Sequence, residues 1–564
     1  MRRALVVISW MLIGASWASA ADRPNVLFIA VDDLKPTIGS YGDSMAQTPN
    51  IDRLAARGLQ FDRAYCMQAV CSPSRNAMLT GLRPQTLRIY DLGTNFRRSV
   101  PDVVTLPQHF KQHGWRAEAL GKLFHVGHGN HEDEASWSVP HFRAKSIGYA
   151  LPENRAQLTR EEALFANQGG DVSKLPRGAA FESADVPDNA YGDGKIAEEA
   201  IARLKAAAAK PEEPFFLAVG FLKPHLPFCA PKKYWDLYDP AKLPMPEVTA
   251  PPKDAPAFAP QFGGELRQYA GMPKTGPINQ QQTRQLIHGY YAATSYMDAQ
   301  LGKVLDALDE LKLADNTIVV FWGDHGWHLG DHGIWCKHTN YEQATRVPLI
   351  IASPGKRAGE RTSVITEFVD VYPTLCELAG IEMPSHLQGE SLIRLLDRSG
   401  AGDSEAGVAF QVYPRSTKEH GPMLGHAVRT DRWRYVEWQN AEGKAVAREL
   451  YDLRDDPGET VNVAADSQFE AVVVQHSKLI RDQLAKPHPK GLKLLDPKKP
   501  ASGKSKVNRA TLFQRKDKNG DGKLSREEFL ANQPDPDEAP KRFIRFDVNE
   551  DGEISRQEFV NPRS

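Results

Sequence analysis

Three unbroken apolar runs, each ending abruptly in charged or imidazole side chains, constrain this 564-residue chain more than any other feature. The runs cover residues 25–31, 214–222 and 317–322, and they lead into Asp32-Asp33, Lys223-Pro-His225 and Gly323-Asp-His325. Apolar runs without alternation are typical of strands buried on both faces of a mostly parallel sheet. Ligands bind at the carboxyl ends of such strands. The pattern predicts an α/β fold with one polar site at the edge of its sheet.

The first run ends in two adjacent carboxylates, Asp32 and Asp33. Neighbouring carboxylates repel each other and are costly to bury, so a divalent cation between them is the simplest explanation. The alternative is that one of the two aspartates only caps a turn.

Residues 71–81 read C-S-P-S-R-N-A-M-L-T-G. This stretch matches the complete signature C-x-P-S-R-x-x-x-L-T-G of the type I sulfatases, and the chain resembles that family. An isolated cysteine would more often be a buried or disulfide-bonded residue. The resemblance implies an alkaline-phosphatase-like sulfatase fold of the α/β class, with a central mostly parallel sheet and a smaller C-terminal antiparallel subdomain. It also implies that a formylglycine-generating or other sulfatase-maturing enzyme oxidises Cys71 to formylglycine.

The hydrate of formylglycine suits the hydrolysis of sulfate esters. A serine or thiolate that attacked the ester would itself become sulfated, and a second displacement at sulfur would be needed to clear it. In the hydrate, one hydroxyl attacks sulfur, and deprotonation of the other then expels sulfate by C–O cleavage. Covalent catalysis thus divides one hard step into two easier ones.

The resemblance extends over about residues 24–485 and implies further catalytic groups. Arg75 and Lys122 would hold the hydrate and offset its charge, and His125 would be the base that starts sulfate elimination. His225 would contact the sulfate or protonate the leaving alcohol, and Lys337 would be the remaining sulfate ligand.

One active-site cation, Ca²⁺ or another divalent ion, is implied as well. Its ligands by family position are Asp32, Asp33, Cys71, Asp324 and His325. An imidazole is a softer ligand than the oxygen atoms that calcium favours, so the identity of the metal stays open.

Four stretches look specifically like the iduronate-2-sulfatase branch: residues 68–75, 121–125, 216–228 and 324–330. The implied substrate is a 2-O-sulfated uronic acid in a glycosaminoglycan or similar polysaccharide, and another sulfated polysaccharide is the alternative. Trp327, Arg415 and His426 are the candidate substrate contacts. A guanidinium group binds a carboxylate bidentately, whereas the plainer interpretation of Arg415 and His426 is ordinary surface charge.

The last 55 residues contain two calcium-loop patterns. The loop positions are Asp517, Asn519, Asp521, Lys523 and Glu528 in the first, and Asp547, Asn549, Asp551, Glu553 and Glu558 in the second. Their spacing is that of EF-hand loops. We therefore expect an appended α-helical EF-hand pair with bound Ca²⁺ over residues 510–564. It would follow a C-terminal sulfatase subdomain at 405–485 and a Lys/Pro-rich linker at 486–509.

Residues 1–20 have the pattern of a signal peptide, with Arg2 and Arg3 before an apolar run and Ala-Ser-Ala at 18–20. The mature protein is therefore expected to be exported to the periplasm or the extracellular space, with its catalytic domain at 21–404. No later stretch approaches eighteen apolar residues, so no membrane span is expected after signal removal. The 70 Lys and Arg balance the 71 Asp and Glu, which gives no general attraction for nucleic acid.

Two other classes of function stay open. Metal-dependent phosphate and phosphonate hydrolases share this fold family, and a non-enzymatic calcium-binding adhesion protein would depend on residues 510–564. The chain has five cysteines, and an odd number leaves at least one unpaired. Cys71 is the natural candidate for that unpaired residue.

Overall fold

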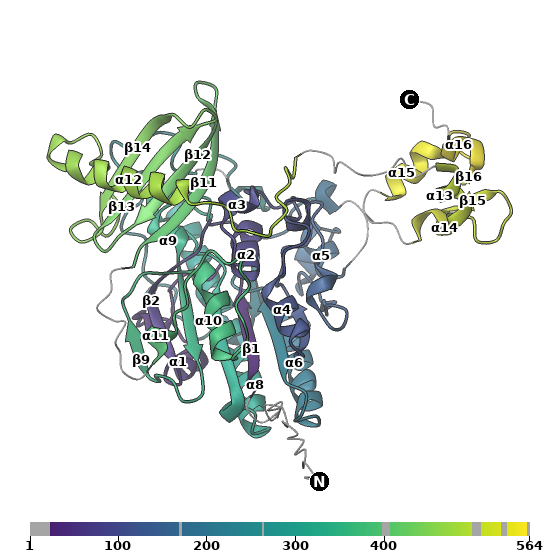
Figure 1. Cartoon of the computed structure of the whole chain (residues 1–564), viewed down its shortest axis with the longest axis horizontal. Coiled ribbons are helices and arrows are strands. Elements are labelled where there is room, and N and C mark those ends of the chain that lie inside the picture. Colours follow the sequence, from purple (N-terminus) through teal and green to yellow (C-terminus); the bar gives the residue numbers. More distant parts are fainter. Residues whose placement is uncertain are drawn as a thin grey trace, which may run out of the picture.

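The computed structural model describes residues 23–167, 172–261, 264–397, 407–498, 509–531 and 539–560. The predicted signal peptide lies outside these ranges. An eight-stranded sheet forms the centre (Figure 1), with strand order β10-β2-β8-β7-β1-β5-β3 and β9 paired to β2. The strands are β1 (Asn25–Val31), β2 (Leu59–Tyr65), β3 (Arg116–Gly121), β5 (Phe215–Phe221), β7 (Thr317–Gly323), β8 (Arg346–Ala352), β9 (Glu360–Thr362) and β10 (Thr366–Glu367).

The three apolar runs form the middle of this sheet. β1 pairs in parallel with β5 on one side and with β7 on the other, and Val31 is opposite both Phe221 and Gly323. β3 adds to β5 in parallel, whereas β8 is antiparallel to β7 and β2. The sheet is therefore mixed but mostly parallel, as predicted. Its register brings the residues that follow β1, β5 and β7 to one edge.

Helices cover both faces of the sheet because successive side chains of β1 point in opposite directions. Phe28 packs in one core cluster with α2 (Cys71–Thr80), α4 (Leu106–Gln112) and α10 (Val371–Leu378). Ile29 packs in the other with α1 (Pro49–Ala55), α6 (Gly192–Ala208) and α8 (Gln280–Glu310). Within the described ranges, every helix is too short or too polar to cross a bilayer.

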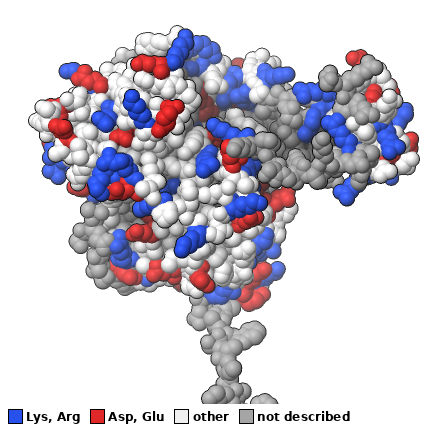
Figure 2. Space-filling model, turned by 45° about the horizontal axis from the view of Figure 1, so that its top comes forward, with Lys and Arg blue, Asp and Glu red and all other residues white. Residues whose placement is uncertain are grey.

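A four-stranded antiparallel sheet follows in the sequence, with β11 (Ala409–Thr417), β12 (Gly421–Arg429), β13 (Trp433–Asn440) and β14 (Ala445–Asp452) in sequential order. Helix α12 (Glu470–Ala485) packs on it through Val473 and Ile480. On the face shown in Figure 2, Lys and Arg lie interspersed with Asp and Glu over the catalytic part of the chain. All five cysteines lie within the described ranges, and each is buried and unpaired.

The first part of the predicted linker is packed against the catalytic part of the chain. Leu492 and Leu494 contact the core cluster of α2 and α4, and the N–H of Leu495 donates to the carbonyl of Ser99 at 2.8 Å. Residues 499–508 lie outside the described ranges.

Two helix–loop–helix units close the chain. The first comprises α13 (Arg509–Lys516), β15 (Lys523–Ser525) and α14 (Arg526–Leu530), and the second α15 (Ala539–Phe546), β16 (Glu553–Ser555) and α16 (Arg556–Val560). Leu524 and Ile554 pair across the two short strands and share a small core with four phenylalanines. This is the architecture of a paired EF-hand.

Candidate active site

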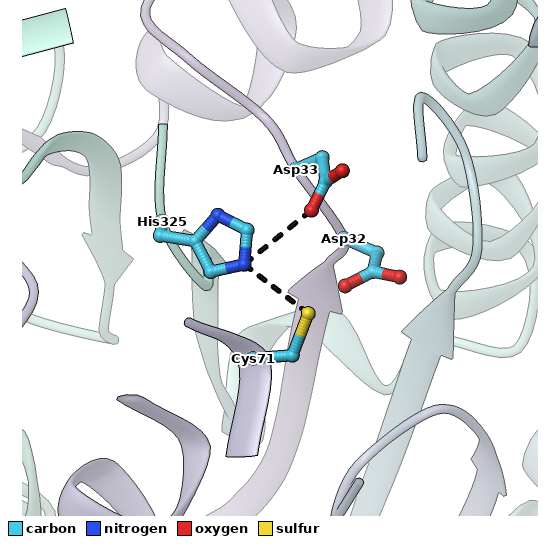
Figure 3. A group of neighbouring side chains, drawn as sticks. All are labelled: Asp32, Asp33, Cys71 and His325. Atoms are coloured by element: carbon cyan, nitrogen blue, oxygen red, sulfur yellow. Dashed lines mark hydrogen bonds and ion pairs between the residues drawn. The ribbon is translucent and has the colours of Figure 1, made fainter. Parts of the chain in front are cut away.

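Four predicted metal ligands converge at the edge of the central sheet (Figure 3). Asp32 and Asp33 follow β1, His325 follows β7, and Cys71 begins α2. The Sγ atom of Cys71 lies 3.2 Å from Nε2 of His325, and that nitrogen lies 3.4 Å from Oδ1 of Asp33. All four side chains are buried, and their ligand atoms lie within 4.8 Å of one another. Two carboxylates, an imidazole and the side chain at position 71 therefore surround a single point.

The chemistry of this group fits a divalent cation. Burial raises the pKa of Asp33 to about 6, a shift that Lys337, His225 and His325 beside it only partly offset. Burial acts to lower the pKa of His325, but Asp324, Cys71 and Asp33 outweigh it and raise this pKa to about 9. A cation would neutralise the buried carboxylates and displace the proton from His325, since a coordinating imidazole must be neutral.

Asp324, the fifth predicted ligand, lies beside this group of four. Its Oδ1 accepts hydrogen bonds at 3.0 Å from the backbone N–H groups of Asp33 and His325. Its Oδ2 accepts one at 2.7 Å from Nε of Arg75. The structure thus brings Asp324 to the site, where its contacts orient Arg75 and the turn after β7.

Two basic side chains contact Asp32. Nζ of Lys122 lies 2.5 Å from Oδ2 of Asp32, and Nη2 of the fully buried Arg75 lies 3.3 Å from Oδ1. Arg75 also donates to the carbonyls of Lys122 and Leu123. Although burial opposes it, the charges of Lys122, His225 and Arg75 hold the pKa of Asp32 well below its usual range. Arg75 is one helical turn from Cys71, which places it where the resemblance predicts.

A second pair of basic groups, Lys337 and His225, lies close to Asp33. Nζ of Lys337 is 3.0 Å from both carboxylate oxygens of Asp33, and Nε2 of His225 is 3.9 Å from Oδ2. Burial lowers the pKa of His225 despite the carboxylates nearby. Four of the five predicted catalytic groups other than Cys71 thus border the aspartate pair directly.

Sequence reasoning missed Glu265, which belongs to the same group. Its Oε2 lies 3.4 Å from Nζ of Lys337 and 3.5 Å from Nε2 of His225, and its Oε1 accepts from Arg177 at 3.4 Å. Although burial opposes it, the charges of His225, Lys337 and Arg177 hold the pKa of Glu265 well below its usual range. Glu265 lies in a proline-rich insert without a motif or period, so no local pattern marks it.

The fifth catalytic candidate, His125, is buried, and its Nε2 lies 3.3 Å from Nδ1 of His128. Burial, with Lys122 adding to it, lowers the pKa of His125 to about 3. The imidazole is therefore neutral at neutral pH, which is the form that a base requires.

The three candidate substrate contacts have different surroundings. Trp327 is 1% exposed, and its ring lies 5.0 Å from Nζ of Lys337. Arg415 donates to the carbonyls of Phe258, Ala259 and His338. His426 is buried in β12, and burial lowers its pKa to about 4. Trp327 therefore lies against Lys337, and the substrate roles of Trp327, Arg415 and His426 stay predictions.

The EF-hand loops are arranged for calcium. Oε1 of Glu528 accepts from the N–H of Lys518 at 3.1 Å, and Oε1 of Glu558 accepts from the N–H of Val548 at 3.1 Å. The twelfth residue of each loop thus closes back on its start. The side chains of Lys523 and Glu553 pair with each other at 2.6 Å. Since the seventh position of such a loop supplies a backbone carbonyl, this pairing leaves the ligand set intact.

The sheet order and the buried cluster at its edge define a protein of the α/β class with the sulfatase fold. The family model described as Sulfatase matches residues 24–381, that of the N-sulphoglucosamine sulphohydrolase C-terminal region matches 330–486, and EF-hand models match 509–531 and 541–561. The chain belongs to the sulfatase family and carries a C-terminal EF-hand region.

Its relatives include enzymes of known name. Iduronate 2-sulfatase of Mus musculus is 34% identical over 522 residues, which cover 80% of this chain and 92% of the relative. A sulfatase of Formosa agariphila is 34% identical over 474 residues, covering 80% and 85%. Among solved structures, the phosphonate monoester hydrolase of Silicibacter pomeroyi has a TM-score of 0.66 at 24% identity, covering 83% of this chain and 96% of that one.

Proposed function

We propose that this sulfatase hydrolyses the 2-O-sulfate ester of a uronic acid in a glycosaminoglycan or similar polysaccharide. The proposal is supported by the similarity to iduronate 2-sulfatase over nearly the full length of that enzyme. The resemblance of residues 324–330 to that branch adds to it, because this segment supplies both His325 and Trp327. Sulfate release from defined heparin and dermatan disaccharides tests the proposal. Preference for a sulfate at another position would redirect it to another sulfated polysaccharide.

The convergence of Cys71 with Asp33 and His325 carries the catalytic part of the proposal. When present, formylglycine at position 71 supplies the nucleophilic hydroxyl of its hydrate, and a divalent cation, Ca²⁺ by family resemblance, polarises the sulfate. The ligands would be Asp32, Asp33, His325 and residue 71, with Asp324 beside them.

The remaining groups of the site handle charge and protons. Arg75 and Lys122 offset negative charge at residue 71, while Lys337 and His225, which lie close to Asp33, bind sulfate oxygens. His225 contacts the sulfate or, in its protonated form, donates a proton to the leaving alcohol, and His125 accepts one when sulfate is expelled. Glu265 holds Lys337 and His225 in place through its contacts with both.

Phosphoryl chemistry is the second candidate, because the fold is shared with a phosphonate monoester hydrolase. Parallel assays with an aryl sulfate and an aryl phosphate separate the two. We expect faster turnover of the sulfate, since the Cys71 signature is that of sulfatases.

We also propose that the protein is exported and that a sulfatase-maturing enzyme modifies Cys71 in the producing cell. Mass spectrometry tests both points. The mature chain should begin after Ala20, and the peptide containing residue 71 should carry the aldehyde.

A further inference from the structure

The segment that follows His125 adopts an uncommon backbone conformation. Gly127, His128 and Gly129 all have positive φ angles, of 114°, 55° and 88°. The turn is closed by two hydrogen bonds between Gly127 and Asn130, at 3.0 and 2.8 Å. A histidine with positive φ is uncommon and costs free energy, so the surrounding structure must hold it there.

Contacts on the turn show what holds it. Nδ2 of the buried Asn130 lies 3.4 Å from Oγ of Ser72, the residue directly after Cys71. Oδ1 of Asn130 accepts a hydrogen bond at 2.9 Å from Nδ2 of Asn95. A Cβ atom added to Gly93 would lie 2.5 Å from the carbonyl oxygen of His128, so this backbone packs closely against the turn. The turn is therefore anchored beside the nucleophile position.

This anchoring places one imidazole against another. The rings of His125 and His128 lie in nearly parallel planes, with centroids 5.4 Å apart and an interplanar angle of 26°. Nε2 of His125 lies 3.3 Å from Nδ1 of His128, so one ring donates to the other. His125 is 8% exposed, whereas His128 lies at the surface. Nδ1 of His125 is buried and has no hydrogen-bond partner among the described residues.

A buried base that takes up a proton must pass it to solvent before it can act again. We propose, on the basis of the role given to His125 above, that His128 carries this proton from His125 to water. His125 accepts the proton at Nδ1, the proton on its Nε2 passes to Nδ1 of His128, and His128 releases one from its Nε2 to water. One proton enters and one leaves, and exchange with water restores the starting tautomers.

Both rings of the pair are able to accept a proton at neutral pH. Burial lowers the pKa of His128 to about 4 and that of His125 to about 3, so both rings are neutral acceptors at neutral pH. Besides His125, the charged groups that act on His128 are Arg160, Arg177 and Glu265. Because His125 is buried and His128 is exposed, a proton passed to the outer ring can leave to water.

The test uses the full-length matured enzyme and two substitutions of His128. Glycine fits the positive φ and leaves room for free imidazole, and Asn tolerates this φ without being able to relay a proton. With a 2-O-sulfated uronate disaccharide as substrate, we expect His128→Gly and His128→Asn to lower kcat about tenfold. This loss is smaller than that expected on removing a general base, because water partly replaces the relay. Imidazole in the buffer should restore most of the rate to His128→Gly and little to His128→Asn. His131→Asn is the matched control, because His131 is an exposed histidine of the same loop.

A second readout is independent of turnover. In histidine-labelled protein, the ¹⁵N shift of Nε2 of His125 should change in His128→Gly and stay constant in His131→Asn, since only the former loses its partner. A kcat within twofold of wild type in both His128 variants would overturn the relay, as would a loss that imidazole fails to restore to a folded His128→Gly protein. Turnover by the wild-type enzyme tests the proposed function separately, so failure of the relay would leave that function intact.

Discussion

Nζ of Lys337 lies 3.0 Å from both carboxylate oxygens of Asp33 and 3.4 Å from Oε2 of Glu265. One buried ammonium group is therefore shared by two carboxylates, one at the end of the first strand and one in an insert of irregular structure. A sulfate group that binds Lys337 must share its charge with both. The affinity of the site for sulfate thus depends on how much of this charge Glu265 already neutralises.

Glu265→Gln removes that neutralising charge and keeps the shape of the side chain. We expect the inhibition constant of inorganic sulfate to fall about threefold to tenfold. The reason is that the variant lacks the repulsion between the Glu265 carboxylate and a sulfate group bound a few ångströms away, which screening only partly reduces. The kcat should fall, because His225 loses the partner that holds its ring. Inhibition constants and sulfate release measure both effects, with the exposed Glu247→Gln on the same insert as control. Weaker inhibition by sulfate in Glu265→Gln would contradict this role.

Cys71→Ser tests the nucleophile. The substitution keeps a small side chain at a buried position, so the thermal midpoint should stay within a few degrees of wild type. We expect sulfate release to fall by at least a thousandfold, because a sulfated serine has no second hydroxyl through which to expel sulfate. The control is Cys376→Ser, which replaces another buried cysteine in helix α10, away from the site. Repeated turnover by Cys71→Ser would rule out the hydrate as nucleophile.

Substitutions should remove calcium binding by the EF-hands without affecting the metal site at Asp32 and Asp33. Replacing both loop-closing glutamates, as Glu528→Gln with Glu558→Gln, removes the bidentate ligand from each EF-hand. We expect calorimetry to show the loss of two Ca²⁺ sites while sulfate release stays within twofold of wild type. Strong chelation should abolish turnover in either protein, because it also strips the site at Asp32 and Asp33. Glu527→Gln changes an exposed neighbour and serves as control.

Loss of turnover in the double EF-hand variant, with the fold intact, would instead tie catalysis to residues 510–564. That outcome would favour the interpretation in which the calcium-binding region is central to the function of the protein.

Acid should destabilise the protein through His386, whose Nε2 donates a hydrogen bond at 3.1 Å to the carbonyl of Thr80. Burial lowers its folded pKa to about 4, whereas the unfolded value is about 6.5. A neutral buried histidine contributes stability above pH 6.5, and this contribution is lost as the pH falls from 6.5 towards 4. Between pH 7 and pH 5, wild type should lose about 1 to 2 kcal/mol more than His386→Gln. Chemical unfolding at both values measures this, with the exposed His113→Gln as control.

Much of the site could be predicted because its residues directly follow strands that are recognisable in the sequence as unbroken apolar runs. β1 and β7 end at Val31 and Gly323, which pair directly, so Asp33 and His325 meet whenever the sheet forms. β5 also pairs in parallel with β1, so His225, which follows β5, is brought to the same edge of the sheet. The fold class follows from these strands and from the length of the helices between them.

Other parts could not be predicted because they depend on long-range packing. Glu265 lies in a stretch without periodicity, and it is held by an ion pair with Arg177, which is far from it in the sequence. His128 is placed by a turn that contacts Ser72, and a lone histidine between two glycines gives no sign of this contact. The contacts of Arg415 with the carbonyls of Phe258 and His338 likewise join segments far apart in the sequence, which no local pattern indicates.

The place of β1 at the middle of the sheet affects how the chain can fold. Strand β1 pairs with residues 215–221 on one edge and with residues 317–323 on the other, so one of its edges stays unpaired until more than half of the polypeptide has been made. Contacts of such high sequence separation slow folding and leave apolar edges open to aggregation meanwhile. A truncated product lacking β7 would therefore carry a central strand with one apolar edge unpaired.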